Sequence, residues 1–169
     1  MPDWYDQPWQ GSGCYDTTID RCPVTVCYCW RIVDLGGGAH YYDYVMTSLQ
    51  ERTDCGNDFS TLLNDAGYRL IADNPAGFPC PTTSPGIIYR FAVATCWIWH
   101  YISWGLISVP FFETCGGDAW CVQPYGVWCD NGVKRITPGT STVTGSADCH
   151  TVAYYGGFPA ETCVLIFCN

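Results

Sequence analysis

Cysteine is the residue whose number and spacing say most about the chemistry of this chain, because 13 of its 169 residues are cysteine. No pair has the C-x-x-C spacing of zinc sites and thioredoxin-type redox sites, and the C-x-x-C-H motif of covalent haem is absent as well. The pattern therefore predicts a framework of disulfide bonds, with no metal and no cofactor. The disulfide candidates are Cys14, Cys22, Cys27, Cys29, Cys55, Cys80, Cys96, Cys115, Cys121, Cys129, Cys149, Cys163 and Cys168.

An odd number of cysteines leaves one sulfur over after every possible bridge has formed within the chain. A buried free thiol is the simpler prediction, and a symmetric bond between identical cysteines of two chains is the alternative. The one tight pair, Cys27-Tyr28-Cys29, is typical of a strand that projects two sulfurs from the same face toward separate partners.

The residues that could carry out catalysis are few. The G-x-S-x-G motif of a nucleophilic serine is absent, and none of His40, His100 and His150 has a recognisable catalytic companion. Two carboxylates can cleave a glycosidic bond when they converge, and Glu113 and Glu161 each lie in a Glu-Thr-Cys sequence. We therefore predict no catalytic residues, and we keep a secreted hydrolase that uses Glu113 or Glu161 as a third hypothesis.

Disulfide bonds persist outside the reducing cytosol, so the cysteine content predicts a secreted or cell-surface protein. Residues 1–6 lack the basic and apolar regions of a signal peptide, and we expect a mature chain whose leader has been removed or omitted. Residues 91–109 hold no charged side chain over a length that could span a bilayer, but their Trp-rich composition favours two buried strands. We expect no transmembrane anchor.

Composition and charge exclude several classes of protein. Aromatic residues make up 16% of the chain and charged residues only 14%, which excludes intrinsic disorder. The formal net charge of −9 would repel a phosphate backbone, so nucleic acid is not an expected partner.

The element pattern predicts one α+β, β-rich domain, a disulfide-stapled antiparallel sheet with one main amphipathic helix at about 58–74. Apolar residues recur there with helical spacing, and Pro75 ends the helix. Gly67 inside it costs about 1 kcal/mol relative to Ala, which allows a kink or an early end. A short helix over Tyr42–Glu51 is also expected.

Most other segments read as strands. Val24–Val33 alternates between two faces, and Ile87–Val93 begins an apolar run. Residues 125–129 and 133–137 flank Asp130-Asn131-Gly132, the strongest hairpin signal in the chain, because Asn-Gly supplies the positive φ angles of a tight turn.

The first residues differ from the rest. We expect residues 1–12 to form an N-terminal aromatic arm, and residues 13–169 a single disulfide-rich domain. Trp4, Tyr5 and Trp9 lie in this Pro- and Asp-containing arm, whose few residues cannot cover these rings by themselves. They are the candidate residues of a subunit interface, in which an extended segment adds to a neighbouring molecule.

Cys22-Pro-Val-Thr-Val-Cys27-Tyr28-Cys29 and Asn74-Pro-Ala-Gly-Phe-Pro-Cys80 resemble segments of uncharacterised secreted, cysteine-rich bacterial proteins, as does the region from Cys115 to Cys129. This resemblance implies a bacterial extracellular setting and favours a subunit of a fibre or surface layer. It implies no site residues.

Three functional hypotheses follow. The first is an extracellular structural protein that assembles with copies of itself into a filament or surface layer. The second is a secreted glycan-binding or adhesive module, with glycans as its partners through exposed Trp side chains. The third is the hydrolase described above.

Overall fold

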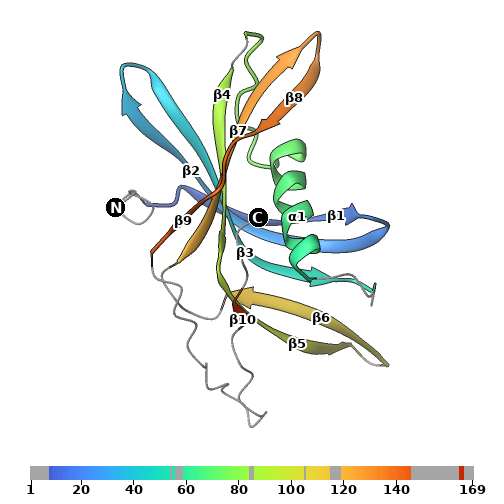
Figure 1. The fold of residues 1–169 in the computed structure, drawn as a ribbon. Coiled ribbons are helices and arrows are strands. Elements are labelled where there is room, and N and C mark those ends of the chain that lie inside the picture. Colours follow the sequence, from blue (N-terminus) through green and yellow to red (C-terminus); the bar gives the residue numbers. More distant parts are fainter. Residues whose placement is uncertain are drawn as a thin grey trace.

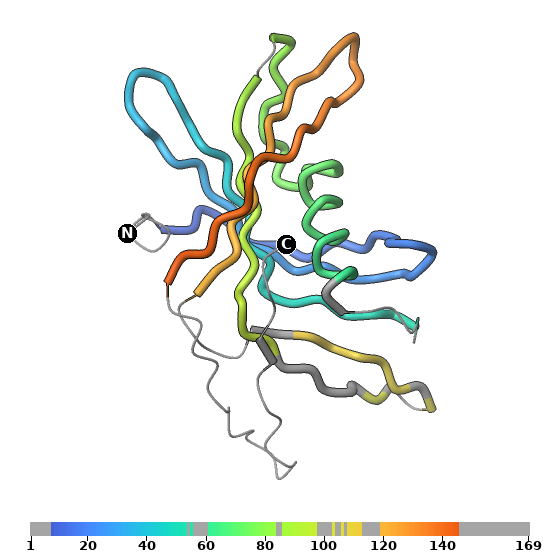
Figure 2. Tube along the Cα trace, in the orientation of Figure 1, coloured from blue at the N-terminus to red at the C-terminus, as the bar shows by residue number. Residues whose placement is uncertain are grey.

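The computed structural model describes residues 8–53, 55, 59–83, 86–104, 106–114, 119–145 and 164–165. They form a curled ten-stranded sheet with one helix (Figures 1 and 2). The elements are β1 (Gly11–Ile19), β2 (Cys22–Gly36), β3 (Ala39–Glu51), α1 (Phe59–Asp73), β4 (Ile87–Ala94), β5 (Cys96–Trp104), β6 (Ile107–Thr114), β7 (Trp120–Asp130), β8 (Val133–Pro138), β9 (Thr142–Thr144) and β10 (Val164–Leu165).

Strand β3 is the centre of the sheet, in which the main path of strands is β10-β5-β6-β3-β4-β7-β8. One edge of β3 pairs with β2, which in turn pairs with β1. The other edge is shared, because its first half pairs with β4 and its second half with β6. The predicted β-rich α+β fold is confirmed, with one refinement: β3 and β4 are parallel. A parallel pair needs a crossover connection, and α1 lies in the segment between these two strands.

Helix α1 covers one face of the sheet, where it contacts β1, β3 and β4 (Figure 1). The predicted helix at about 58–74 is therefore confirmed. Its apolar stripe lies in the core, in contact with large side chains of β2, β3 and β4. Between 0% and 1% of each side chain in this stripe is exposed, namely Leu62, Leu63, Ala66, Leu70 and Ile71.

The short helix expected over Tyr42–Glu51 is wrong, because these residues belong to β3. Tyr42, Tyr44 and Met46 alternate toward the core beneath the helix, while Asp43 points to the opposite face and pairs with an arginine of β2. The two-residue period of a strand places the first three side chains on one face and Asp43 on the other. Hydrogen-bonded pairing along both edges of β3 outweighs a weak local preference for helix.

The Asn131-Gly132 turn is found where it is predicted, and a second tight turn is made by two glycines. Asn131 and Gly132 join β7 to β8 with φ angles of 49° and 80°. Gly37 and Gly38 join β2 to β3 with φ angles of 63° and 83°. Residues other than Gly and Asn rarely adopt such angles, so these residues define the two turns. The turn between β1 and β2 differs, because Asp20 and Arg21 adopt φ angles of 47° and 70° there.

The charge-free stretch at 91–109 is not a helix. Its first residues complete β4, and the remainder contributes β5 and the start of β6, which pair as an antiparallel hairpin. The prediction that this stretch forms strands is therefore confirmed. A search of the described residues for a helix long and apolar enough to cross a bilayer finds none.

Three disulfides join described residues, and they link Cys14 to Cys27, Cys22 to Cys55, and Cys80 to Cys129. Cys96 and Cys121 are disulfide-bonded as well. The second bridge fixes the end of β3 to the start of β2, and the third fixes the segment after α1 to β7. Such a framework indicates an oxidising, extracellular environment. Cys115, Cys149, Cys163 and Cys168 lie outside the described residues.

Candidate functional site

The face of the sheet opposite α1 carries a buried ionic cluster on one rung of the ladder. Asp43 on β3 pairs in register with Arg31 on β2 and with Arg90 on β4. Its carboxylate accepts hydrogen bonds from Arg31 Nε at 3.0 Å and from Arg90 Nε and Nη2, both at 2.7 Å. The Asp43 side chain is fully buried, and 1% of Arg31 and 18% of Arg90 are exposed. Two guanidinium groups thus share one carboxylate.

Aromatic rings cover both arginines. The Trp9 ring lies 4.6 Å from the Arg31 guanidinium carbon, and the Tyr41 ring lies 4.1 Å from that of Arg90. Rings at these distances attract a cation and shield it from water. The Asp43 carboxylate is fully engaged with its two arginines, so this cluster supports the sheet and offers no free base for catalysis.

The chain before β1 is held against β2 next to this cluster. The Gln10 backbone N–H donates to Trp30 O at 2.9 Å. The Gln10 side chain donates to Ile32 O at 3.2 Å and accepts from Ile32 N–H at 3.3 Å. Trp9, one of the predicted interface residues, therefore lies over Arg31 and is partly exposed, with 37% of its surface accessible. Trp4 and Tyr5 lie outside the described residues.

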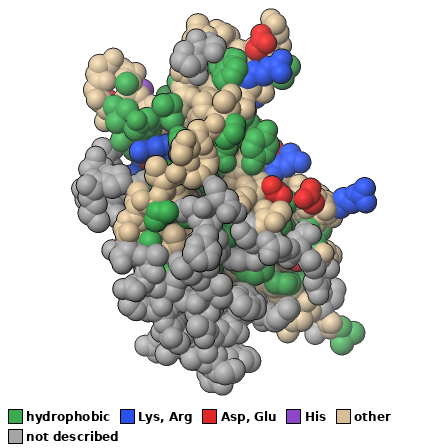
Figure 3. All heavy atoms as spheres, in the orientation of Figure 1, with side chains coloured by type: hydrophobic (Ala, Val, Ile, Leu, Met, Phe, Trp, Pro, Cys, Tyr) green, Lys and Arg blue, Asp and Glu red, His purple; other side chains and the backbone are tan. Residues whose placement is uncertain are grey.

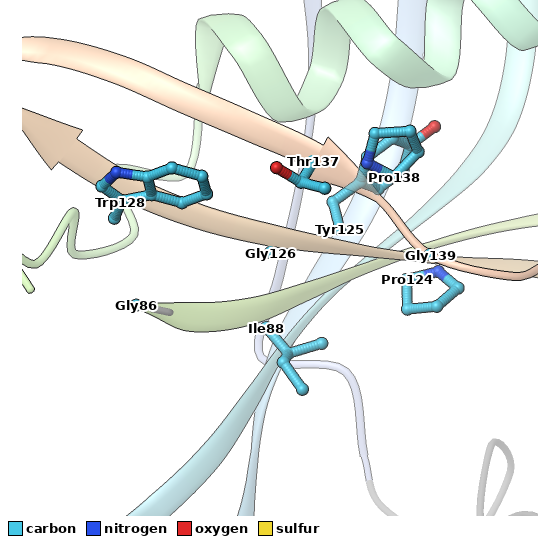
Figure 4. A pocket seen from close by; sticks show the side chains of 9 residues that line it. All are labelled: Gly86, Ile88, Pro124, Tyr125, Gly126, Trp128, Thr137, Pro138 and Gly139. Atoms are coloured by element: carbon cyan, nitrogen blue, oxygen red, sulfur yellow. The ribbon is translucent and has the colours of Figure 1, made fainter. Parts of the chain in front are cut away.

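An apolar groove opens beside the same rung, because Arg90 pairs in register with Pro124 on β7. The groove has a volume of about 630 Å³ and lies across β4, β7 and β8. Figure 4 shows Trp128 and Pro124 at opposite ends of a stretch of β7, with Gly126 between them and Ile88 beside it. Its lining consists of Gly86, Ile88, Pro124, Tyr125, Gly126, Trp128, Thr137, Pro138 and Gly139.

Backbones pack closely together beside this groove. Gly86 has a φ angle of 75°, and a Cβ atom there would collide with the backbone carbonyl of Val127. Ile88 is 41% exposed although it is a large aliphatic residue in a strand. Figure 3 shows described apolar side chains gathered on the upper part of one face, together with Lys/Arg and Asp/Glu side chains, most of them at its top and right. An open apolar depression of this kind is a candidate binding site.

Cys29 is the free cysteine among the described residues. It is half-buried against a small apolar cluster of Val45, Ala92 and Val122, with Trp120 alongside. Burial raises the pKa of the Cys29 thiol, so the thiolate is scarce at neutral pH and the group is a poor nucleophile. The expectation that Cys27 and Cys29 both have disulfide partners is half right, because only Cys27 is bridged.

One group of potential metal ligands is explained by the disulfide framework. The ligand atoms of Cys22, Glu51 and Cys55 lie within 4.8 Å of one another. The two sulfurs are bonded to each other, and Glu51 Oε2 accepts a hydrogen bond from the Cys55 backbone N–H at 3.0 Å. These three residues close the end of β3 and have a structural role.

The predicted carboxylate pair stays a prediction. Glu113 belongs to β6, where its backbone pairs with Ser48 of β3 and with Ile98 of β5. Glu161 and His150 lie outside the described residues. His40 lies at the β2–β3 hairpin, with Nδ1 3.9 Å from Asp34 Oδ1. His100 belongs to β5.

Comparisons of the chain with protein-family models, with curated proteins and with solved structures find no match. The sequence patterns described above predict neither the groove nor the ionic cluster. For the cluster a signal existed, since Arg31 and Asp43 are each flanked on both sides by large apolar or aromatic residues. For the groove there was none, because its lining comes from three strands and from glycines that pack closely.

Proposed function

We propose that this protein is an extracellular structural subunit that assembles with copies of itself into a filament or surface layer. The disulfide framework supports a domain that stays folded outside the cell, where each bridge contributes about 2–4 kcal/mol. The sheet supplies a stiff body, and the aromatic residues before it supply a contact for a neighbouring subunit.

The observation that carries this proposal is the anchoring of residues 8–10 on β2 by the hydrogen bonds of Gln10 and the ring of Trp9. Trp4 and Tyr5 therefore precede, by a few residues, a point of the chain that is fixed on the surface of the domain. Aromatic side chains bury a large apolar area and dominate the energetics of protein interfaces. From that fixed point they can be presented to another subunit.

The test is a full-length chain with the double substitution Trp4→Ala and Tyr5→Ala. We expect the protein concentration needed for assembly to rise at least tenfold, while the folded domain and its disulfides are unchanged. Light scattering, and electron microscopy under non-reducing conditions, measure this. Tyr68→Ala is the matched control, because Tyr68 is an exposed aromatic residue on α1, 48% accessible. Assembly of the double variant at the wild-type concentration would refute the proposal.

Glycan binding is the second candidate function, and the position of Trp128 in an open groove favours it. An accessible indole ring can stack on the apolar face of a sugar. Saturable binding of an oligosaccharide panel by the monomer, lost in Trp128→Ala and kept in Tyr68→Ala, would support this function over self-assembly.

A further inference from the structure

The groove has a lining that suits an extended peptide with proline and aromatic side chains. Trp128, Pro124, Pro138 and Ile88 present rings and aliphatic carbon, and Thr137 adds a hydroxyl group. Grooves that bind extended Pro-containing segments are lined in this way. A sugar carries hydroxyl groups around its ring, and each one that is buried without a hydrogen-bond partner costs free energy. The chemistry of the groove therefore favours a peptide.

We infer that this groove receives residues 1–7, the first part of the aromatic arm, of a second copy of the chain, with Trp4 and Tyr5 against Trp128. The inference rests on the proposed function and names the surface that would accept the arm. Pro2 and Pro8 bracket the arm. Proline fixes its own φ and holds the residue before it in an extended conformation, so the arm loses less conformational entropy on binding.

Charge favours the same pairing. The arm carries Asp3 and Asp6, and a chain with a net charge of −9 repels an acidic segment over most of its surface. The face that bears the groove is different, because on the rung next to it Arg90 shares one carboxylate with a second arginine. Arg135 lies opposite Trp128 in the register of β7 and β8, and its Nη2 pairs with Asp130 Oδ2 at 3.5 Å. The excess positive charge beside the groove is therefore that of the buried cluster, in which two arginines face one carboxylate.

Geometry favours an arm from a second copy. Trp9 lies over Arg31, and Pro124 is three strands away on the same rung, about 14 Å at a strand spacing of 4.8 Å. Trp128 lies four residues further along β7, which brings the total separation to about 19 Å. The five residues from Trp9 to Trp4 span about 17 Å when fully extended. An arm of the same chain would therefore have to be fully extended from Trp9 to Trp4 to bring these rings near Trp128, whereas the arm of another copy has no such limit.

The first experiment measures binding of a fluorescent peptide of residues 1–8 to the full-length Trp4→Ala/Tyr5→Ala chain, whose own arm cannot compete. We expect saturable binding that weakens at least tenfold when Ile88→Asp is added, because this places a negative charge in the groove. Val133→Asp is the matched control, since Val133 is 53% exposed at the β7–β8 turn, outside the groove. Trp128→Ala provides a second groove variant. Equal binding to the parent and the Ile88→Asp chain would overturn the inference, as would binding of oligosaccharides in place of the peptide.

The second experiment mixes two chains that each lack one half of the contact. The Trp4→Ala/Tyr5→Ala chain keeps its groove, and the Ile88→Asp chain keeps its arm. Each alone should remain monomeric, and an equimolar mixture should give heterodimers that do not grow further. A mixture that stays monomeric, under conditions where the wild-type chain assembles, would overturn the inference.

These outcomes separate the inference from the proposed function. If the arm variant assembles like the wild-type chain, the proposed function fails. If the arm variant fails to assemble but Ile88→Asp assembles normally, self-assembly through the arm stands and only the groove is excluded as its receptor.

Discussion

At the scale of single residues, Asp43 shows how a buried charge is kept in a sparsely charged chain. Its carboxylate is fully buried and faces two guanidinium groups, while Trp9 and Tyr41 lie over those groups. Taking charges out of water is costly, and paired hydrogen bonds of good geometry offset that cost. The cluster also holds β2, β3 and β4 in register, because each strand supplies one member.

Replacing Asp43 with Ala should lower the free energy of unfolding by about 3–5 kcal/mol, because it removes the carboxylate and leaves positive charge in a dry environment. Urea denaturation followed by tryptophan fluorescence measures the change. Asp16→Ala is the control: its carboxylate pairs with Arg52 at 3.0 Å, but both side chains are more than half exposed. A change of at most about 1 kcal/mol is expected there. Equal losses in the two variants would contradict this account.

At the scale of elements, α1 is amphipathic as the spacing of its apolar residues requires, and Gly67 neither kinks nor ends it. The reason that a glycine stands there lies in the packing against β4. A Cβ atom at position 67 would lie 2.6 Å from Cδ1 of Phe91, a core side chain that is 4% exposed. The helix and the strand approach each other closely at this point, and only a residue without a side chain fits.

Gly67→Ala should therefore destabilise the protein, although alanine favours helix by about 1 kcal/mol over glycine. Forcing a methyl group into a packed core costs about 1–3 kcal/mol, and Phe91 belongs to the close-packed core. Asn64→Ala, an exposed position on the same helix, is the control and should stabilise by a few tenths of a kcal/mol, about 0.5 at most. Thermal unfolding monitored by circular dichroism compares the two. A higher melting temperature for Gly67→Ala would disprove the packing argument.

At the scale of the whole molecule, buried tyrosines connect the helix, the sheet and the segment after the helix. The Tyr44 hydroxyl donates to Asn74 Oδ1 at 2.9 Å and accepts from the Ala76 N–H at 3.0 Å. The Tyr89 hydroxyl donates to Pro79 O at 2.9 Å. Burial raises the pKa values of Tyr15, Tyr44 and Tyr89, and it raises the pKa of Tyr125 to about 12.

This cluster predicts how stability depends on pH. A raised pKa means that the folded state holds its protons more tightly than the unfolded state, whose tyrosines ionise near pH 10. The stabilisation is therefore complete below pH 10 and is lost as the pH rises through 10 toward 12 and above. We expect unfolding free energies from urea titrations to be equal at pH 6 and 7 and to be lower at pH 11. Phenolate absorbance at 295 nm should rise together with unfolding for these tyrosines, and their ionisation near pH 10 in the folded protein would contradict the prediction.

The sequence alone determined the features that depend on local chemistry. The spacing of apolar residues predicted α1, the Asn-Gly pair predicted the β7–β8 turn, and the cysteines predicted a disulfide framework. Each of these follows from neighbours within a few residues, or from composition. The wrong prediction at 42–51 arose where local pattern was ambiguous, because a strand paired along both edges can hold side chains that an isolated segment would not favour.

Only the tertiary structure decided which distant residues meet. The parallel pairing of β3 and β4, the choice of Cys29 as the free thiol among the described cysteines, the sharing of Asp43 by two arginines and the groove beside Trp128 all depend on strand order and register. These are set by the packing of the strands against one another and against α1, a free energy summed over many contacts between residues far apart in the chain. No short segment of the sequence determines this free energy. Strand order and register therefore could not be predicted from local sequence patterns.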